Sequence, residues 1–112
     1  MSTDRDFIDY LAEQIDLGSR LSHRKMFGEY ALYVDGKVVA FACDNSLFVK
    51  PSAAAAARVP PLPQRPPYPG AKDYPVADEL LDDGDAIRQL ILQTAELMPP
   101  PKPKKAAARR TP

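Results

Sequence analysis

The side chains that most often carry catalysis are scarce in this chain. It has one histidine, His23, and one cysteine, Cys43, and nothing in the sequence places one beside the other. Zinc and iron–sulfur centres need several His or Cys ligands that converge on one point, so both are excluded for the monomer. Cys43 alternates with Phe41 and Val39, which is typical of a small residue buried in a strand. We expect no cofactor, no metal site and no catalytic residue.

An acidic cluster, Asp82-Asp83-Gly84-Asp85, superficially suggests calcium. It lacks the alternating ligand spacing and the distal glutamate of a calcium loop, so a solvated helix start is the better interpretation. No glycine-rich phosphate loop, no Gly-x-Ser-x-Gly elbow and no motif of paired carboxylates is present. We therefore do not expect an enzyme.

Length and composition indicate one ordinary globular domain. The chain has 112 residues, of which 45% are hydrophobic and 27% charged, enough for one core. No apolar run approaches the roughly 18 residues of a membrane span, and the N-terminal residues lack the basic-then-apolar order of a signal peptide. The expected location is cytoplasmic, and a lone cysteine agrees with a reducing compartment.

Prolines and charges divide the chain. Six of the 13 prolines lie in residues 60–70 and five lie in residues 99–112. Residues 1–98 hold all 15 acids and 10 of the 15 bases, hence a net charge of −5, while residues 99–112 carry +5. We expect a domain over residues 1–98, with a proline-rich strap at 60–70, followed by a disordered basic tail over 99–112.

Helical periodicity is clear at both ends of this domain. Over residues 4–17, apolar side chains recur every three or four positions, and Thr3 or Asp4 is the expected N-cap. A second helix is predicted to begin after Asp82-Asp83-Gly84-Asp85, with residues 78–81 forming a separate turn. Its apolar stripe consists of Ile87, Leu90, Ile91, Thr94, Leu97 and Met98.

Between the helices the period changes to two. Residues 30–34 alternate, Asp35-Gly36 suits a type I′ hairpin turn, and residues 37–43 are apolar on both faces, as in a covered central strand. Residues 44–46 turn the chain into a strand at 47–50, and residues 23–27 form a first strand before Gly28.

The remaining segments are short. Residues 53–58 are predicted to be helical, and residues 72–77 an edge strand. We expect the strap to be extended, with Tyr68 packed over the sheet edge rather than offered as a polyproline ligand. The fold class is α+β: an antiparallel meander of three to five strands packed by N-terminal and C-terminal helices. A homodimer is plausible on this pattern, because two helices give limited cover to a sheet with two apolar faces.

One block of residues carries a family resemblance. It runs Arg24-Lys25-Met26-Phe27-Gly28, then Tyr30-Ala31-Leu32-Tyr33 with Asp35-Gly36-Lys37, then Phe41-Ala42 and Leu47-Phe48-Val49-Lys50, followed by Pro67-Tyr68-Pro69-Gly70. This pattern resembles the N-terminal domain of the TfoX (Sxy) family over roughly residues 5–100. Family members often have glycines where this chain has Glu29 and Ala31.

The resemblance implies a non-catalytic interaction module. The family includes bacterial regulators of natural competence, thought to act with a cyclic-AMP receptor type activator at promoters, and many small single-domain members. By this resemblance the chain would be a transcriptional co-regulator whose protein partner is such an activator or RNA polymerase. The candidate interaction surface consists of Arg24, Lys25, Met26, Phe27, Gly28, Tyr33 and Lys50.

Two alternatives remain open from the sequence. One is a small-ligand-binding or enzymatic domain with a pocket near Met26–Gly28. The other is weak, non-specific DNA binding through the cations of the tail, which are Lys102, Lys104, Lys105, Arg109 and Arg110. The net charge of −5 on residues 1–98 opposes the approach of DNA to the rest of the surface.

The tail alternative makes a direct prediction. If the tail binds phosphates, the full chain will bind labelled duplex DNA weakly, with an affinity that falls steeply as salt rises, and a chain ending at residue 98 will not bind. Fluorescence anisotropy at several salt concentrations measures both. Equal binding by the shortened chain would contradict the idea.

Overall fold

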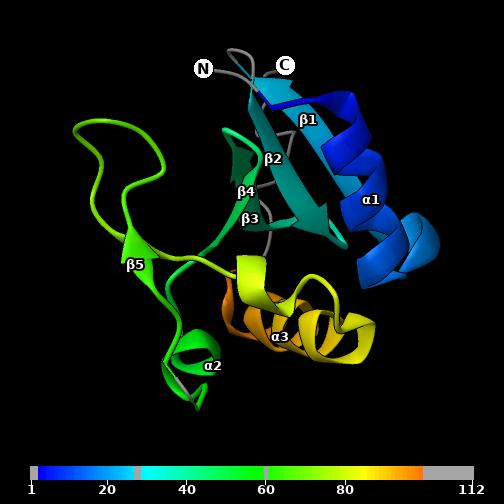
Figure 1. Ribbon diagram of the computed structural model, residues 1–112. Coiled ribbons are helices and arrows are strands. Elements are labelled where there is room, and N and C mark those ends of the chain that lie inside the picture. The colour runs from blue at the N-terminus through cyan, green and yellow to red at the C-terminus, as the bar shows by residue number, and fades with distance from the viewer. Residues whose placement is uncertain (1–2, 27–28, 60, 100–112) are drawn as a thin grey trace, which may run out of the picture.

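An antiparallel meander of four strands forms the centre of the computed structural model, which describes residues 3–26, 29–59 and 61–99 (Figure 1). Its strand order is β1-β2-β3-β4, with bounds β1 Leu21–Met26, β2 Glu29–Val34, β3 Lys37–Cys43 and β4 Ser46–Val49. Two-residue turns join β2 to β3 and β3 to β4. Asp35 and Gly36 have φ of 51° and 84°, and Asp44 and Asn45 have φ of 52° and 58°. Positive φ at both central residues is the type I′ geometry that matches strand twist, so the turn predicted at Asp35-Gly36 is confirmed.

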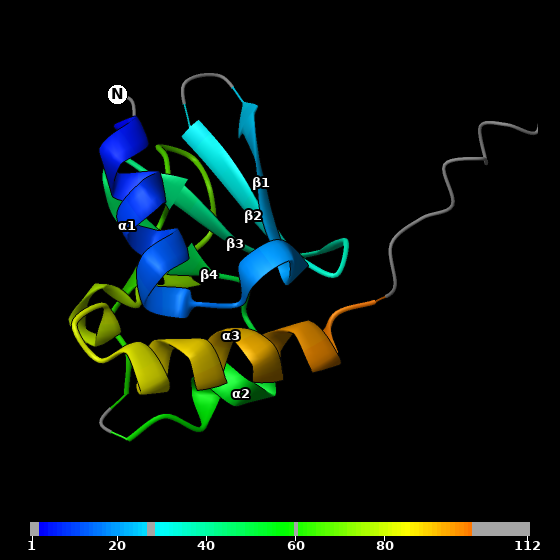
Figure 2. The same ribbon diagram turned by 90° about the vertical axis from the view of Figure 1, so that its right-hand side faces the viewer.

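Two helices cover one face of this sheet (Figure 2). Helix α1, Arg5–Ile15, and helix α3, Gly84–Leu97, bury their apolar stripes against β2, β3 and β4. Asp83 caps α3 by accepting the N–H of Ala86 at 3.1 Å, which makes the acidic cluster a helix start as predicted. Leu97 was predicted to belong to the apolar stripe of α3 but is 52% exposed, since the buried face of the helix ends with Thr94 and Ala95.

Asp4, one of the two expected N-cap residues, occupies the N-cap position of α1, but its side chain makes no hydrogen bond to the helix. Thr3 is buried instead, and its hydroxyl lies 2.6 Å from Oε1 of Glu29 and 3.0 Å from the carbonyl oxygen of Ala42. Glu29 also accepts the N–H of Asp44 at 3.1 Å. The carboxylate at this position therefore ties the N-terminus to the β3–β4 turn.

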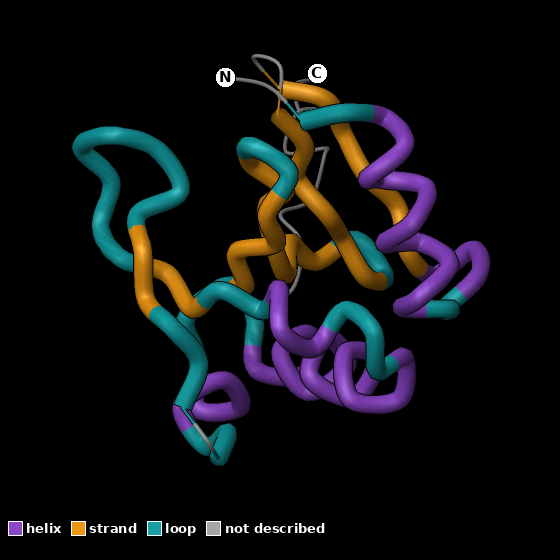
Figure 3. The backbone as a smooth tube through the Cα atoms, in the orientation of Figure 1, coloured by secondary structure: helices purple, strands orange, loops and turns teal. Residues whose placement is uncertain are grey.

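Several short elements complete the fold, and those at residues 53–56, 74–75 and 78–80 lie within segments predicted to be a helix, an edge strand and a turn. Helix α2, Ala53–Ala56, packs on α3 and is capped by Ser52, while the short 3-10 helices are η1, Gly18–Arg20, and η2, Asp78–Leu80. Strand β5, Gln64–Arg65, pairs with β6, Tyr74–Pro75, so the predicted edge strand at 72–77 is only two residues long. The loop between β5 and β6 projects from the body of the molecule (Figure 3).

The segment that follows the proline-rich strap packs on the second face of the sheet, at β3 and β4. Phe48 and Cys43 pack with Val76, and the rings of Phe41 and Tyr74 lie against this cluster with their centroids 6.0 Å apart. The prediction that Tyr68 packs over the sheet was wrong, since Tyr68 is 64% exposed. Leu62 and Pro67 are the buried residues of the strap instead. Residues 74–76 thus cover part of the face that lies away from the helices.

The β4 edge of the sheet is closed by the segment that follows β6. Val76 forms an isolated bridge with Phe48, and the N–H of Ala77 donates to the carbonyl oxygen of Leu47 at 2.9 Å. The N–H of Leu47 in turn donates to Oδ1 of Asp78 at 2.8 Å. Backbone groups that would otherwise face solvent along β4 are therefore satisfied.

Replacing Asp78 tests this closure. We expect Asp78→Ala to lower the free energy of unfolding by about 1–3 kcal/mol, because the amide of Leu47 loses its acceptor. Urea denaturation measures the loss, and hydrogen exchange will show faster exchange at Leu47. Glu79→Ala, at an exposed neighbour, is the matched control and should change stability by less than about 0.5 kcal/mol. Equal stability of the two variants would contradict the role of Asp78.

Candidate functional site

Strand β1 is the exposed edge of the sheet. It pairs only with β2, and Ser22 to Met26 are all exposed, whereas β2 is buried along most of its length. Met26 exposes 40% of its surface, which is uncommon for a large apolar side chain in this molecule. The two edges of the sheet therefore differ. Residues 76–78 bind along β4, whereas β1 has a neighbouring strand on one side only among the described residues.

The register between β1 and β2 places the residues of the predicted interaction surface on two opposite faces of the sheet. Arg24 pairs with Ala31, and Ser22 pairs with Tyr33, so Arg24 and Tyr33 lie on the face away from the helices. Lys25 pairs with Tyr30, which belongs to the core under the helices, so Lys25 lies at the opposite face. Phe27 and Gly28 fall outside the described residues.

Lys50 lies apart from the other predicted residues. Its Nζ lies 5.9 Å from the ring centroid of Phe41 and 5.8 Å from that of Tyr74, within the range of a cation–π contact. It follows β4, so two strands separate it from β1. The structure therefore places Arg24, Met26 and Tyr33 near one edge on one face. Lys50 lies beside the rings of Phe41 and Tyr74.

The ion pairs leave two cations of β1 uncompensated. Arg20 binds Asp35 through two nitrogens, at 2.8 and 3.2 Å, and this guanidinium lowers the pKa of the Asp35 carboxyl. The ion pairs formed among the described residues include neither Arg24 nor Lys25. The ring of His23 lies edge-on to Tyr30 with centroids 5.5 Å apart. Within the described part of the chain, Arg24 and Lys25 therefore carry positive charges that no ion pair neutralises.

Cys43 lies in an environment that suppresses thiol chemistry. It is buried beside Phe48 and Val76, and burial together with Glu29 and Asp44 raises the pKa of its thiol to about 11. The thiolate is the reactive form, so this site has little nucleophile near neutral pH. His23 is on β1 and faces Tyr30, so the fold does not bring the two residues together.

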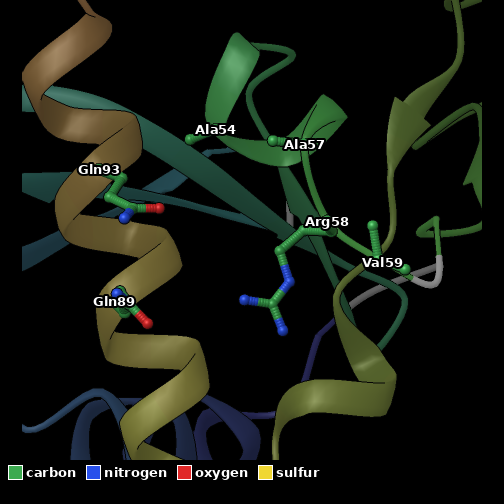
Figure 4. Close-up of a pocket in the computed structure, with 6 residues that line it drawn as sticks. All are labelled: Ala54, Ala57, Arg58, Val59, Gln89 and Gln93. Carbon is green, nitrogen blue, oxygen red and sulfur yellow. The ribbon is translucent and has the colours of Figure 1, made fainter.

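The alternative of a ligand pocket near Met26 concerns the hollows of the surface. One hollow lies between α2 and α3 and another beside the strap, and Met26 lines neither of them. The first, of about 280 Å³, lies between α2 and α3 and is lined by Ala54, Ala57, Arg58, Val59, Gln89 and Gln93. Figure 4 shows the guanidinium of Arg58 and the amides of Gln89 and Gln93 at the same opening. These groups can hydrogen-bond an anion, but none can act as a general base near neutral pH.

The second hollow lies beside the strap. It has a volume of about 240 Å³ and is lined by Cys43, Asp44, Ser46, Phe48, Arg65 and residues 66–69. The guanidinium of Arg65 donates to the hydroxyl of Ser46, pairs with Asp78 at 3.8 Å and lies 5.5 Å from the ring of Phe48. Its charge is therefore already engaged within the fold.

The sequence signals did not identify the group at the first hollow. Gln89 and Gln93 are four residues apart and so share one face of α3, which helical spacing alone could have indicated. Their proximity to Arg58 depends on how α2 packs against α3, and no local pattern reports that packing.

The described residues form neither a metal site nor a membrane-spanning helix. Across residues 3–26, 29–59 and 61–99, no three His, Cys, Asp or Glu side chains gather as a metal site. Within the same ranges, no helix is long and apolar enough to cross a membrane. The tail cations Lys102, Lys104, Lys105, Arg109 and Arg110 lie outside the described residues.

Comparison with known proteins gives two matches. The family model described as the TfoX N-terminal domain matches residues 13–97. A protein of Spirochaeta aurantia named "Uncharacterized 12.7 kDa protein in trpE 5′ region" is 42% identical over 106 residues, which cover 95% of this chain and 92% of that protein. No solved structure matches the chain.

The environment of Cys43 predicts a pH dependence. Between pH 9 and 11 the unfolded chain loses the thiol proton while the folded chain keeps it, so the free energy of unfolding falls as pH rises. Urea denaturation of the natural chain and of Cys43→Ala across this range will show an extra loss in the natural chain. At pH 8 the folded thiol will resist a disulfide reagent that labels the unfolded chain. Rapid labelling of the folded chain would contradict this assignment.

Proposed function

The chain belongs to the TfoX N-terminal domain family, and we propose that it is a non-catalytic module that regulates transcription by binding a protein partner. The observation that carries this proposal is the edge strand β1, which is exposed and basic while the opposite edge is closed. A contact surface there consists of Arg24, Lys25 and Met26, with Tyr33 behind them on the outer face.

The placement of reactive groups supports a role in binding. Cys43 is buried with a raised thiol pKa, and His23 lies on another strand. The hollow at Arg58 offers hydrogen-bond donors without a base or a nucleophile. Nothing in these arrangements provides the pairing of nucleophile and base on which covalent catalysis depends.

Charge supports a partner with an acidic contact surface. Arg24 and Lys25 form no ion pair with the described residues, so an acidic surface can approach without breaking an existing pair. A cyclic-AMP receptor type activator or RNA polymerase is the partner that this family membership favours. Contact through such a protein would bring the module to a promoter while its own acidic body stays away from the DNA.

Charge reversal on β1 tests the proposal. Tagged natural chain, incubated with an extract of the bacterium that encodes it, should capture the activator or RNA polymerase. The Arg24→Glu/Lys25→Glu variant should capture at least about tenfold less, because two attractive contacts become repulsive. Immunoblotting for both candidate partners quantifies the capture.

A variant of equal charge controls for non-specific electrostatics. Arg5→Glu/Lys72→Glu has the same net charge, changes two exposed residues away from β1, and should capture the partner as the natural chain does. Equal capture by both double variants would place the contact elsewhere. Capture of neither partner by the natural chain would remove the support for transcriptional co-regulation.

A further inference from the structure

The backbone of β1 presents hydrogen-bonding groups along its outer edge. The carbonyl oxygen of Arg20 accepts the N–H of Asp35 at 2.9 Å, which makes these residues a hydrogen-bonded pair in line with the β1–β2 register. In an antiparallel ladder such pairs alternate with pairs whose backbone groups face away. Ser22 and Arg24 therefore face β2, while the N–H and C=O groups of His23 and Lys25 point outward.

The outer edge is accessible in the described structure. Both His23 and Lys25 are exposed, and no described element lies beyond β1 (Figure 2). The β4 edge, in contrast, uses Val76, Ala77 and Asp78 to satisfy the same kinds of groups. Among the four strands of this sheet, β1 alone therefore offers a row of unpaired backbone N–H and C=O groups to an incoming strand.

Side-chain charge determines which strand fits. In an extended strand, adjacent residues lie on opposite faces, so Arg24 presents a cation on the outer face and Lys25 one on the helix-covered face. Pairing with β1 of a second copy would place these cations near their equivalents, and like charges across a strand pair are destabilising. An extended segment with carboxylates on both faces would be attracted by Arg24 on the outer face and by Lys25 on the helix-covered face.

We propose that β1 recognises its partner by strand addition: an extended acidic peptide segment pairs with the backbone of His23 and Lys25 as a fifth strand, its carboxylates beside Arg24 and Lys25. This rests on the proposed function and adds the class of segment and the geometry of the contact. Main-chain hydrogen bonds then supply affinity, and the two cations select acidic segments.

A proline variant separates backbone pairing from charge. His23→Pro removes one outward N–H and keeps Arg24, Lys25 and the ladder to β2, because proline is tolerated where the N–H faces away from the sheet. His23→Ala removes the same side chain but keeps the N–H. Thermal melting of both variants checks that each remains folded.

The probe is the capped, fluorescent peptide Thr-Glu-Glu-Thr-Thr-Glu-Glu-Thr, titrated with the full chain and followed by anisotropy. Its glutamates lie on both faces when it is extended, and a matched peptide has glutamine in their place. We expect the natural chain and His23→Ala to bind it with similar affinity, and His23→Pro to bind at least about tenfold more weakly. The glutamine peptide should also bind at least about tenfold more weakly.

Methylation of the peptide backbone gives a readout that does not depend on a variant's folding. One version of the peptide is N-methylated at all four glutamates, which removes N–H donors from both edges of the extended chain, and the control version is N-methylated at its last threonine only. Strand addition requires that the first version binds at least about tenfold more weakly than the control. Equal binding by both versions would overturn the proposal, as would equal binding by His23→Pro and His23→Ala.

The cellular capture experiment distinguishes the failure of this inference from the failure of the proposed function. If Arg24→Glu/Lys25→Glu no longer captures the partner and His23→Pro still does, the basic contact surface is supported and strand addition is contradicted. If both retain the partner, the proposed surface itself is wrong. Self-association of the neutral variant Arg24→Gln/Lys25→Gln without any peptide binding by the natural chain would show that the charges only protect an open edge, and would also overturn strand addition.

Discussion

The strand β3 must be covered on both of its faces, and this constraint organises the rest of the molecule. Ala40 and Ala42 lie in the core under the helices, while Cys43 packs with Phe48 and Val76 on the opposite face. A central strand with two apolar faces loses the favourable free energy of hydrophobic burial on any face that stays exposed to water. The chain meets this requirement with two different covers. Helices α1 and α3 form one layer, and the strap with β5 and β6 forms the other (Figure 1).

The second cover also determines what remains available on the surface. Arg65 of the strap binds Ser46 and Asp78, and the segment that follows the strap places the ring of Tyr74 beside Lys50. The same segment continues along β4 and satisfies its edge. Cys43 is buried beneath it. The opposite edge differs, because β1 has exposed backbone groups there and its two cations form no ion pair with the described residues.

Much of the fold could be predicted from local patterns, and the errors have a common cause. The turn at Asp35-Gly36 and the helix start at Asp83 follow from the chemistry of a few neighbouring residues, and both are as expected. Tyr68 and Leu97 were assigned to buried positions and are exposed. Each belongs to an apolar pattern that is locally convincing, but burial depends on whether another segment reaches that position.

The candidate site shows the same division. The composition of β1, with Arg24 and Lys25 in sequence, was visible, and the alternation of a strand already implied that the two cations face opposite ways. Lys50 was grouped with them by sequence and lies two strands away. Glu29 and Ala31 each have a structural role. Glu29 bonds Thr3 and Asp44, and Ala31 is buried within the sheet.

The sequence by itself determined the periodicities, the turns, the distribution of charge and the scarcity of reactive side chains, because each of these is a property of residues close together in the chain. Only the tertiary structure decided which edge of the sheet is closed and which face the strap covers. Those outcomes depend on contacts between residues 46–48 and residues 63–78, and the free energy of such contacts arises only when distant segments pack together. The basic strand β1 became a candidate binding edge for the same reason, since its exposure is set by what the rest of the chain does not reach.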